Sequence, residues 1–88
     1  MPEENIYIGS KPILSYVTAL VMALQRSDTV NVMARGRAIS SAVDVVEVAR
    51  RSFLTDVDIG SISIGTEKMG EENEVRNVST MCIKLQKK

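Results

Sequence analysis

Histidine and tryptophan are absent from this 88-residue sequence, and cysteine occurs only once, as Cys82. A chain without histidine and without a group of cysteines lacks the usual ligand sets for zinc and other transition metals. We therefore expect no metal site and no cofactor. The single cysteine excludes an internal disulfide and suits a reducing compartment. Because no histidine can activate it, Cys82 is expected to be a structural thiol and not a nucleophile.

Long apolar runs are also missing. The longest nearly apolar stretch, residues 16–24, is far shorter than the ~20 residues that a membrane-spanning helix needs. The acidic start Met1-Pro2-Glu3-Glu4 does not have the pattern of a signal peptide. We expect a cytoplasmic protein with no membrane partner.

Aromatic side chains and net charge are scarce as well. The only aromatics are Tyr7, Tyr16 and Phe53, which argues against base stacking as the main mode of any nucleic-acid recognition. Eleven basic residues balance eleven acidic ones, and the pI is about 6.2. Nucleic-acid-binding domains are usually basic, so such a function requires the charges to be sorted in space. Residues 1–88 are expected to form one domain with a small core, which favours an oligomer.

The order of apolar patterns predicts two strand-helix units followed by a hairpin. A proline at position 12 suits the start of the first helix, and a shift of the apolar phase across Gly60-Ser61 predicts a β-bulge. The second helix carries an apolar stripe of Ile39, Ala42, Val43, Val46, Ala49 and Phe53. The expected segments are strands 5–8, 29–34, 57–66 and 75–86, helices from about 12 to 26 and after residue 37, and a loop at 67–74. This pattern indicates a two-layer α/β domain with both helices on one face of the sheet.

A turn with two arginines separates the second strand from the second helix: Arg35-Gly36-Arg37. Guanidinium groups offer paired donors to phosphate oxygens, glycine permits close approach of the backbone, and the first amides of a helix point outward. The turn is therefore a candidate phosphate site. The alternative is that these arginines are merely solvated, or that they pair with Asp28 or Asp44.

Strand direction brings this turn together with others. If the first three strands are parallel, then the turn Gly9-Ser10-Lys11, the arginine turn and the start of the 67–74 loop lie along one edge of the sheet, where open α/β sheets tend to bind ligands. The expected basic rim consists of Lys11, Arg35 and Arg37, with Lys68 and Arg76 more loosely attached. Such a rim gives a neutral chain a local positive field. Glu71-Glu72 is expected to be a solvated loop tip and not an acid/base pair.

Several segments together resemble the Alba family of archaeal chromatin proteins. They are Lys11-Pro12, Ala34-Arg35-Gly36-Arg37-Ala38-Ile39-Ser40, Ala42-Val43-Asp44, Val46-Glu47, Arg51-Ser52-Phe53-Leu54 and Val78-Ser79-Thr80. The resemblance covers nearly the whole chain. It implies a βαβαββ domain with a mixed four-stranded sheet and an extended C-terminal hairpin arm. It also implies a homodimer that binds duplex DNA and RNA without strong sequence preference and condenses DNA in the nucleoid.

The same resemblance implies roles for individual residues. Arg35 and Arg37 match binding arginines, and Lys11 matches the second of two lysines in a phosphate-contacting turn; a lysine there can be acetylated, which implies an acetyltransferase and a deacetylase as partners. Phe53 matches an aromatic at contacts between dimers arrayed on DNA. This sequence departs from the family where the first lysine is replaced by Ser10, and where the arm tip is acidic. These departures predict weaker or more salt-sensitive DNA binding, or a preference for RNA.

The sequence thus predicts a dimeric, chromosome-associated protein that coats nucleic acid without catalysis. An RNA-binding subunit of a ribonucleoprotein, or an RNA chaperone, is the nearest alternative. A small enzyme that holds a phosphorylated metabolite on Arg35 and Arg37 would need a general base, and Asp44 is the best of a poor set. A purely structural dimerisation module is the third alternative.

Overall fold

The computed structural model describes residues 3–88. The elements follow the order β1 (Glu4–Tyr7), α1 (Ile13–Arg26), β2 (Thr29–Arg35), α2 (Ala38–Ser52), β3 (Val57–Met69) and β4 (Arg76–Lys87). The predicted βαβαββ order is confirmed, with boundaries that shift by one to three residues. Pro12 is the N-cap of α1, where its fixed φ leads the chain into the first turn.

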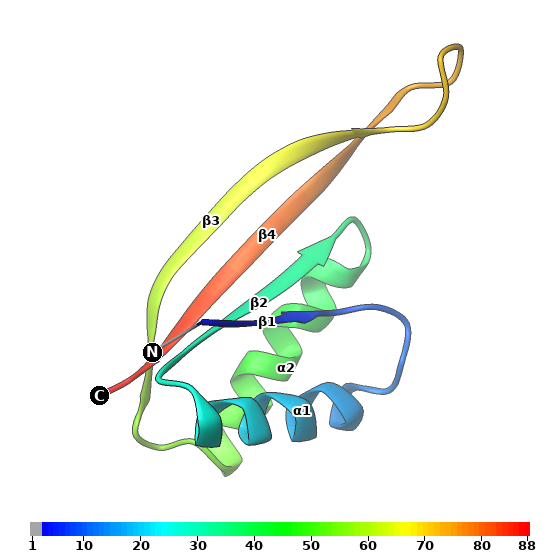
Figure 1. The fold of residues 1–88 in the computed structure, drawn as a ribbon. Coiled ribbons are helices and arrows are strands. Elements are labelled where there is room, and N and C mark those ends of the chain that lie inside the picture. Colours follow the sequence, from blue (N-terminus) through cyan, green and yellow to red (C-terminus); the bar gives the residue numbers. More distant parts are fainter. Residues whose placement is uncertain (1–2) are drawn as a thin grey trace.

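The four strands form one mixed sheet in the order β1-β2-β4-β3. β1 and β2 are parallel, and β4 runs antiparallel to both β2 and β3, so that β1, β2 and β3 all point the same way. Both helices lie on one face of this sheet, and the β3–β4 hairpin extends beyond them as an arm (Figure 1). The carboxyl ends of β1, β2 and β3 therefore share one edge, as the sequence predicts.

The hairpin arm is longer than its polar sequence indicates. The sequence predicts a loop at residues 67–74, but residues 67–69 pair with β4 in the register Glu67↔Val78, Lys68↔Asn77 and Met69↔Arg76. Backbone pairing needs no apolar side chains, so hydropathy alone does not show where such a strand ends. The predicted β-bulge is confirmed, because the register passes from Ile59↔Leu85 to Ser61↔Lys84 and skips Gly60.

The core lies between the helices and β1, β2 and β4. Its largest fully buried side chains are Leu20, Leu24, Val30, Val32, Val45, Val46 and Leu85. The stripe predicted for α2 is partly wrong, since Val43 is 42% exposed and Val45 is completely buried. α2 packs on β2 and α1 through Ala42, Val45, Val46 and Ala49, a narrower stripe rotated toward Val45.

Candidate nucleic-acid interface

The arginine turn is held in a fixed shape by its glycine. Gly36 has a φ of +54°, a conformation that a residue with a Cβ adopts only at a cost. Its N–H donates to the carbonyl oxygen of Ser79 at 2.8 Å, and its own carbonyl accepts from the N–H of Ile39 at 3.2 Å. Arg37 is the N-cap of α2, which has no side-chain cap and no acidic residue in its first turn. The exposed residues Arg35 and Arg37 therefore directly precede the N-terminus of α2, which carries partial positive charge.

The turn after β1 is organised by one buried tyrosine. The hydroxyl oxygen of Tyr16 accepts hydrogen bonds from the backbone N–H groups of Gly9 and Lys11, both at 3.0 Å. The Tyr16 side chain is anchored in the core, while Ser10 and Lys11 are exposed. This turn adjoins the end of β2, because the N–H of Ile8 donates to the carbonyl of Met33 at 2.9 Å. The predicted proximity of the Lys11 turn and the arginine turn therefore has a structural basis in the β1–β2 register.

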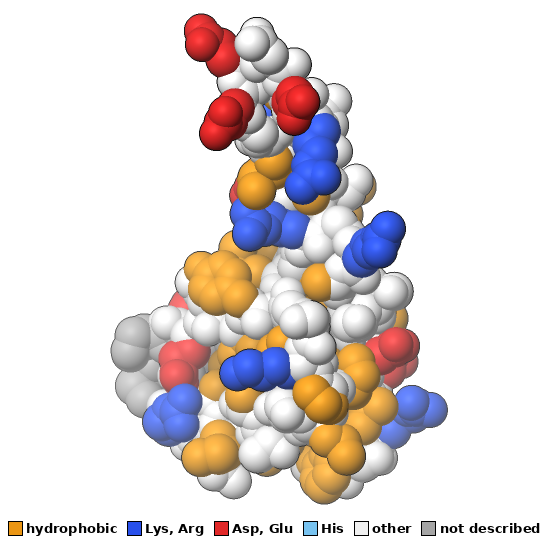
Figure 2. All heavy atoms as spheres, turned by 90° about the vertical axis from the view of Figure 1, so that its right-hand side faces the viewer, with side chains coloured by type: hydrophobic (Ala, Val, Ile, Leu, Met, Phe, Trp, Pro, Cys, Tyr) orange, Lys and Arg blue, Asp and Glu red, His pale blue; other side chains and the backbone are white. Residues whose placement is uncertain are grey.

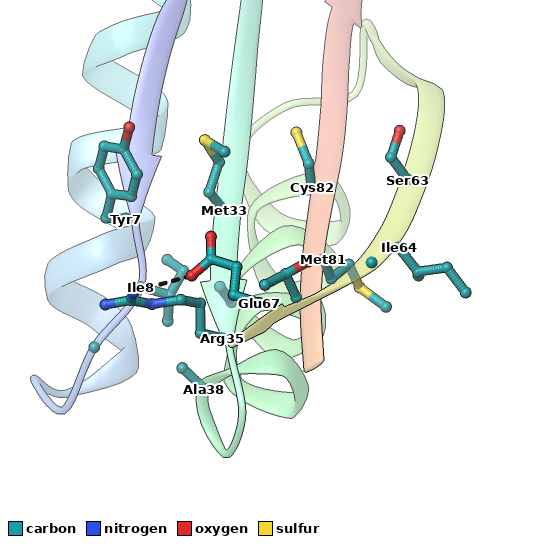
Figure 3. Close-up of a pocket in the computed structure, with 14 residues that line it drawn as sticks. Tyr7, Ile8, Met33, Arg35, Ala38, Ser63, Ile64, Glu67, Met81 and Cys82 are labelled. Atoms are coloured by element: carbon teal, nitrogen blue, oxygen red, sulfur yellow. Dashed lines mark hydrogen bonds and ion pairs between the residues drawn. The ribbon is translucent and has the colours of Figure 1, made fainter. Parts of the chain in front are cut away.

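Arg35 has an ion-pair partner that the sequence did not indicate. Its Nη1 lies 3.2 Å from Oε2 of Glu67 on the arm (Figure 3). The same nitrogen lies 3.7 Å from Sδ of Met69, which is also on the arm. The alternative that these arginines pair with Asp28 or Asp44 is wrong, because no ion pair joins either aspartate to Arg35 or Arg37 within residues 3–88. Both partners remain more than half exposed, so the contact is a screened surface pair of modest strength. Within residues 3–88 no ion pair is found for Lys11, Arg37, Lys68 or Arg76.

The arm carries its basic residues below an acidic tip. Figure 2 shows acidic side chains gathered at the tip and Lys and Arg side chains further down. The tip loop contains Glu71, Glu72 and Glu74, and its turn depends on Gly70, whose φ is +115° and where a Cβ would overlap the carbonyl oxygen of Glu74. Arg76 pairs with Met69 and Lys68 with Asn77, so strand alternation places the two cations on opposite faces of the arm.

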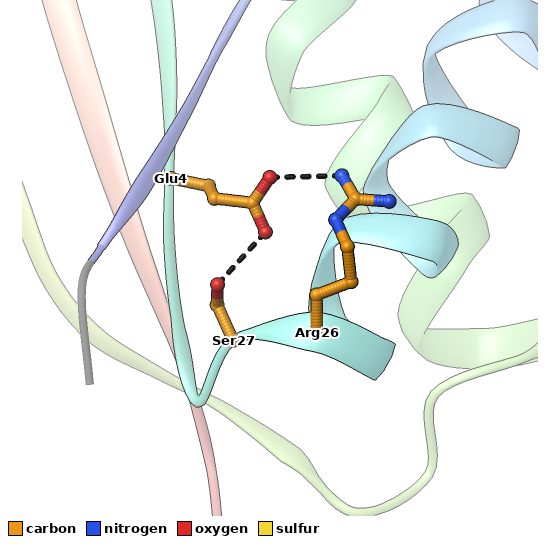
Figure 4. A network of polar contacts seen from close by, with 3 residues as sticks. All are labelled: Glu4, Arg26 and Ser27. Carbon is orange, nitrogen blue, oxygen red and sulfur yellow. Dashed lines mark hydrogen bonds and ion pairs between the residues drawn. The ribbon is translucent and has the colours of Figure 1, made fainter.

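Two acidic residues near the chain start, Glu3 and Glu4, have ion-pair partners at the end of the sheet opposite to the arginine turn. Glu4 accepts from Arg26 Nη2 and Ser27 Oγ, both at 2.8 Å (Figure 4). These hydrogen bonds, that of Arg26 first, hold the pKa of Glu4 below its ordinary value of 4.5. The pKa of Glu3 is also lowered, first by its hydrogen bond from Asn31 and then by Lys84. Although the net charge is zero, Lys11 and Arg37 have no ion-pair partner within residues 3–88, at the end of the sheet where the arginine turn lies.

Exposed apolar side chains form a second surface, on β3 and at the end of α2. Ile62 is 55% exposed and Ile64 is 80% exposed. They pair with Ile83 and Met81, so they lie on the helix-covered side of the sheet, yet they remain uncovered. Phe53, the C-cap of α2, is 60% exposed, which rules out the alternative that it belongs to the core of this chain. Sequence alternation places the isoleucines on one face but cannot show that no helix covers it.

Two candidates from the sequence remain, Asp44 and Cys82. Asp44 is exposed on α2 and makes no ion pair with Arg35 or Arg37 in the described chain. Cys82 is a half-buried thiol on β4. Among residues 3–88, no cluster of His, Cys, Asp or Glu is arranged to hold a metal ion. Neither described helix is both long and apolar enough to cross a membrane.

Comparisons with known proteins agree with this architecture. A family model described as Alba matches residues 4–66. The chain is 45% identical over 89 residues to the DNA/RNA-binding protein Alba 1 of Archaeoglobus fulgidus, covering all of both chains. It is 48% identical to the DNA/RNA-binding protein Alba of Methanocella arvoryzae, covering 99% of this chain and 94% of that one. The solved structure of Alba from Thermoplasma volcanium matches with a TM-score of 0.89 and 36% identity, over 94% of this chain and 99% of that one.

Proposed function

Because this chain belongs to the Alba family, we propose that it binds duplex DNA and RNA without sequence preference, and that it coats and compacts DNA as a homodimer. The relatives named above are described as DNA/RNA-binding proteins, which supports a binding role without catalysis. In this proposal the protein is cytoplasmic and associated with the chromosome.

One observation carries the proposal: the Lys11 turn, the arginine turn and the base of the arm share one edge of the sheet. Exposed cations and backbone amides at this edge hold phosphates, which positions a duplex without reading its bases. The N-terminal turn of α2 carries Ala38, Ile39 and Ser40, which are poorly suited to bidentate base recognition. Non-specific binding follows from that composition.

The uncovered isoleucines of β3 support the dimer. Ile62, Ile64 and the exposed Val43 of α2 are apolar side chains that a second copy of the chain would remove from water. An 88-residue chain also has a small core of its own. Dimerisation doubles the number of cations on the binding surface and gives it two arms. Ile64→Glu should produce monomers in sedimentation experiments, whereas a dimeric Ile64→Glu variant would place the interface elsewhere.

Neutral and acidic residues reduce the positive charge of the proposed interface. Ser10 supplies a hydroxyl and no charge, Glu67 competes for Arg35, and the arm tip is acidic. These features favour weak, salt-sensitive binding of DNA. The same features make RNA the second candidate for the preferred ligand, as in a ribonucleoprotein subunit or an RNA chaperone. Competition between duplex DNA and structured RNA at equal salt separates the two.

Lys11 is the proposed site of regulation by acetylation. Its side chain is exposed, and its backbone is fixed by Tyr16, so an acetyltransferase or a deacetylase could reach the ammonium group without unfolding the turn. Acetylation removes the charge and with it one phosphate contact per chain. Mass spectrometry of the protein from its native source tests whether the modification occurs.

The salt dependence of binding tests the electrostatic mechanism. If each chain contributes Lys11, Arg35 and Arg37, a dimer neutralises about six phosphates, and log K against log salt should slope by about −5 on duplex DNA. The double variant Arg35→Ala/Arg37→Ala should weaken binding to all sequences alike. Arg51→Ala, which removes an exposed arginine at the other end of α2, is the matched control. A slope near zero, or an unaffected double variant, would refute the mechanism.

A further inference from the structure

A hollow of about 570 Å³ adjoins the basic rim, lined mainly from the face of the sheet that the helices leave open. Its volume lies within the usual range of small-ligand pockets. Gly9 and Arg35 form part of its wall, so the hollow is continuous with the proposed phosphate surface. None of the roles proposed above uses the side chains of its floor.

The floor is a row of side chains contributed by all four strands. The register pairs Tyr7 with Met33, Met33 with Cys82, and Cys82 with Ser63. Figure 3 shows these four side chains side by side across the sheet, with Arg35 and Glu67 next to them. The neighbouring row contains Gly65, where a Cβ would stand only 3.1 Å from Oγ1 of Thr80. A side chain at this position would stand on the same face as the floor and narrow the hollow.

The chemistry of this floor suits a flat, uncharged aromatic ligand. Tyr7 is 68% exposed, which leaves the ring of a large aromatic residue accessible. The sulfur atoms of Met33 and Cys82 are polarizable and make favourable contacts with aromatic rings. The rim adds one cation, Arg35, and one carboxylate acceptor, Glu67. Together these side chains offer a surface on which a ring can stack, a cation that can bind phosphate, and an acceptor for ring or amino N–H groups.

We propose that the hollow binds one unpaired nucleobase of a single-stranded nucleic acid, stacked on Tyr7 and Met33, with an adjacent phosphate on Arg35. The base must be unpaired because both faces of a base in a duplex are already covered by its neighbours, whereas splayed bases stack on exposed aromatic side chains. The inference rests on the proposed function, because Arg35 serves both surfaces. A single aromatic cannot organise a long strand, so the site adds to electrostatic binding and does not replace it.

The site predicts a difference between single strands and duplexes. Tyr7→Leu should weaken binding of an eight-nucleotide adenine oligomer by about five- to a hundredfold, and change duplex affinity less than twofold. Tyr7→Phe retains the ring and is the matched control, which should bind both ligands as the native chain does. The adenine oligomer is tested as RNA and as DNA, at one salt concentration.

Tyrosine fluorescence gives a direct readout, because the chain has no tryptophan and only two tyrosines. Stacking of a base on Tyr7 should quench its emission. At saturating oligomer concentration, which offsets any loss of affinity, the quenching should persist in Tyr16→Phe and disappear in Tyr7→Leu. Equal single-strand affinity of Tyr7→Leu and the native chain would overturn the inference. So would a change of oligomeric state in Tyr7→Leu, which would assign the hollow to contacts between copies of the chain.

The two proposals fail in different ways. If the native protein binds duplexes with the expected salt slope but Tyr7→Leu loses no single-strand affinity, only the base site is refuted. If the native protein binds neither duplexes nor single strands at low salt, the proposed function itself fails. Loss of single-strand binding in Tyr7→Leu, with retained duplex binding, supports both.

Discussion

Arg35 and Glu67, 32 residues apart in the sequence, meet where the hairpin arm leaves the body of the protein, with Nη1 and Oε2 3.2 Å apart. The pair links the arginine turn to the arm, and it occupies one of the two arginines that are proposed to hold phosphate. A nucleic acid must therefore compete with an internal carboxylate for the Arg35 guanidinium. The intramolecular pair stabilises the unbound state and weakens binding by the same amount.

Removing this competitor should strengthen nucleic-acid binding. Glu67→Gln is expected to raise duplex affinity about two- to fivefold at low salt, because an exposed ion pair contributes only up to about 1 kcal/mol. Fluorescence anisotropy with a labelled duplex measures the change. Glu72→Gln removes the same charge at the arm tip without touching an arginine, and should have a smaller effect. Equal effects of the two variants would mean that the net charge of the arm matters and the Arg35 contact does not.

Tyr16 connects the core to the Lys11 turn through its hydroxyl. Tyr16→Phe leaves the N–H groups of Gly9 and Lys11 without their acceptor, and should lower the free energy of unfolding by about 1 to 2 kcal/mol. Duplex affinity should fall too, since Lys11 loses its fixed position. Urea denaturation and anisotropy provide the two measurements. Tyr7→Phe, which removes an exposed hydroxyl, is the control, and unchanged stability in Tyr16→Phe would contradict this role.

The polar contacts of Glu4 predict how stability depends on pH. Its pKa is lowered in the folded chain by Arg26 and Ser27, so its ionised form contributes stability above the ordinary value of 4.5. That contribution is lost as the pH falls through the lower pKa of the folded state. Thermal melts between pH 7 and pH 3 should show a shallower acid decline for Glu4→Gln than for the native chain. The same slope for both would show that Glu4 does not contribute.

Phe53 is expected to act between dimers and not within the chain. Because its side chain is 60% exposed, Phe53→Ala should change the melting temperature little. It should reduce the cooperativity of binding to long duplexes while leaving the affinity for a single-site duplex nearly unchanged. Binding isotherms on short and long duplexes measure both quantities. Undiminished cooperativity would remove Phe53 from the contacts between dimers.

Much of the fold could be read from local patterns. The apolar phase shift at Gly60-Ser61 predicted the β-bulge, and Pro12 marked the start of the first helix, because backbone geometry at these positions depends on neighbouring residues. The buried face of α2 was predicted less accurately from the sequence. Two valines, Val43 and Val45, both suit a buried position by type, and only the packing of α2 against β2 and α1 buries the second and exposes the first.

The candidate site, too, could be predicted from the sequence only in part. The sequence by itself determined the order of the elements, the arginine turn and the family, since each depends on local patterns and short motifs that can be recognised along the chain. Only the tertiary structure decided that Glu67 reaches Arg35, that Ile62 and Ile64 stay uncovered, and that Tyr7 shares a row with Met33 and Cys82. These relations depend on strand register and on the length of the arm, and both are set by backbone pairing between segments far apart in the chain, which local hydropathy does not encode.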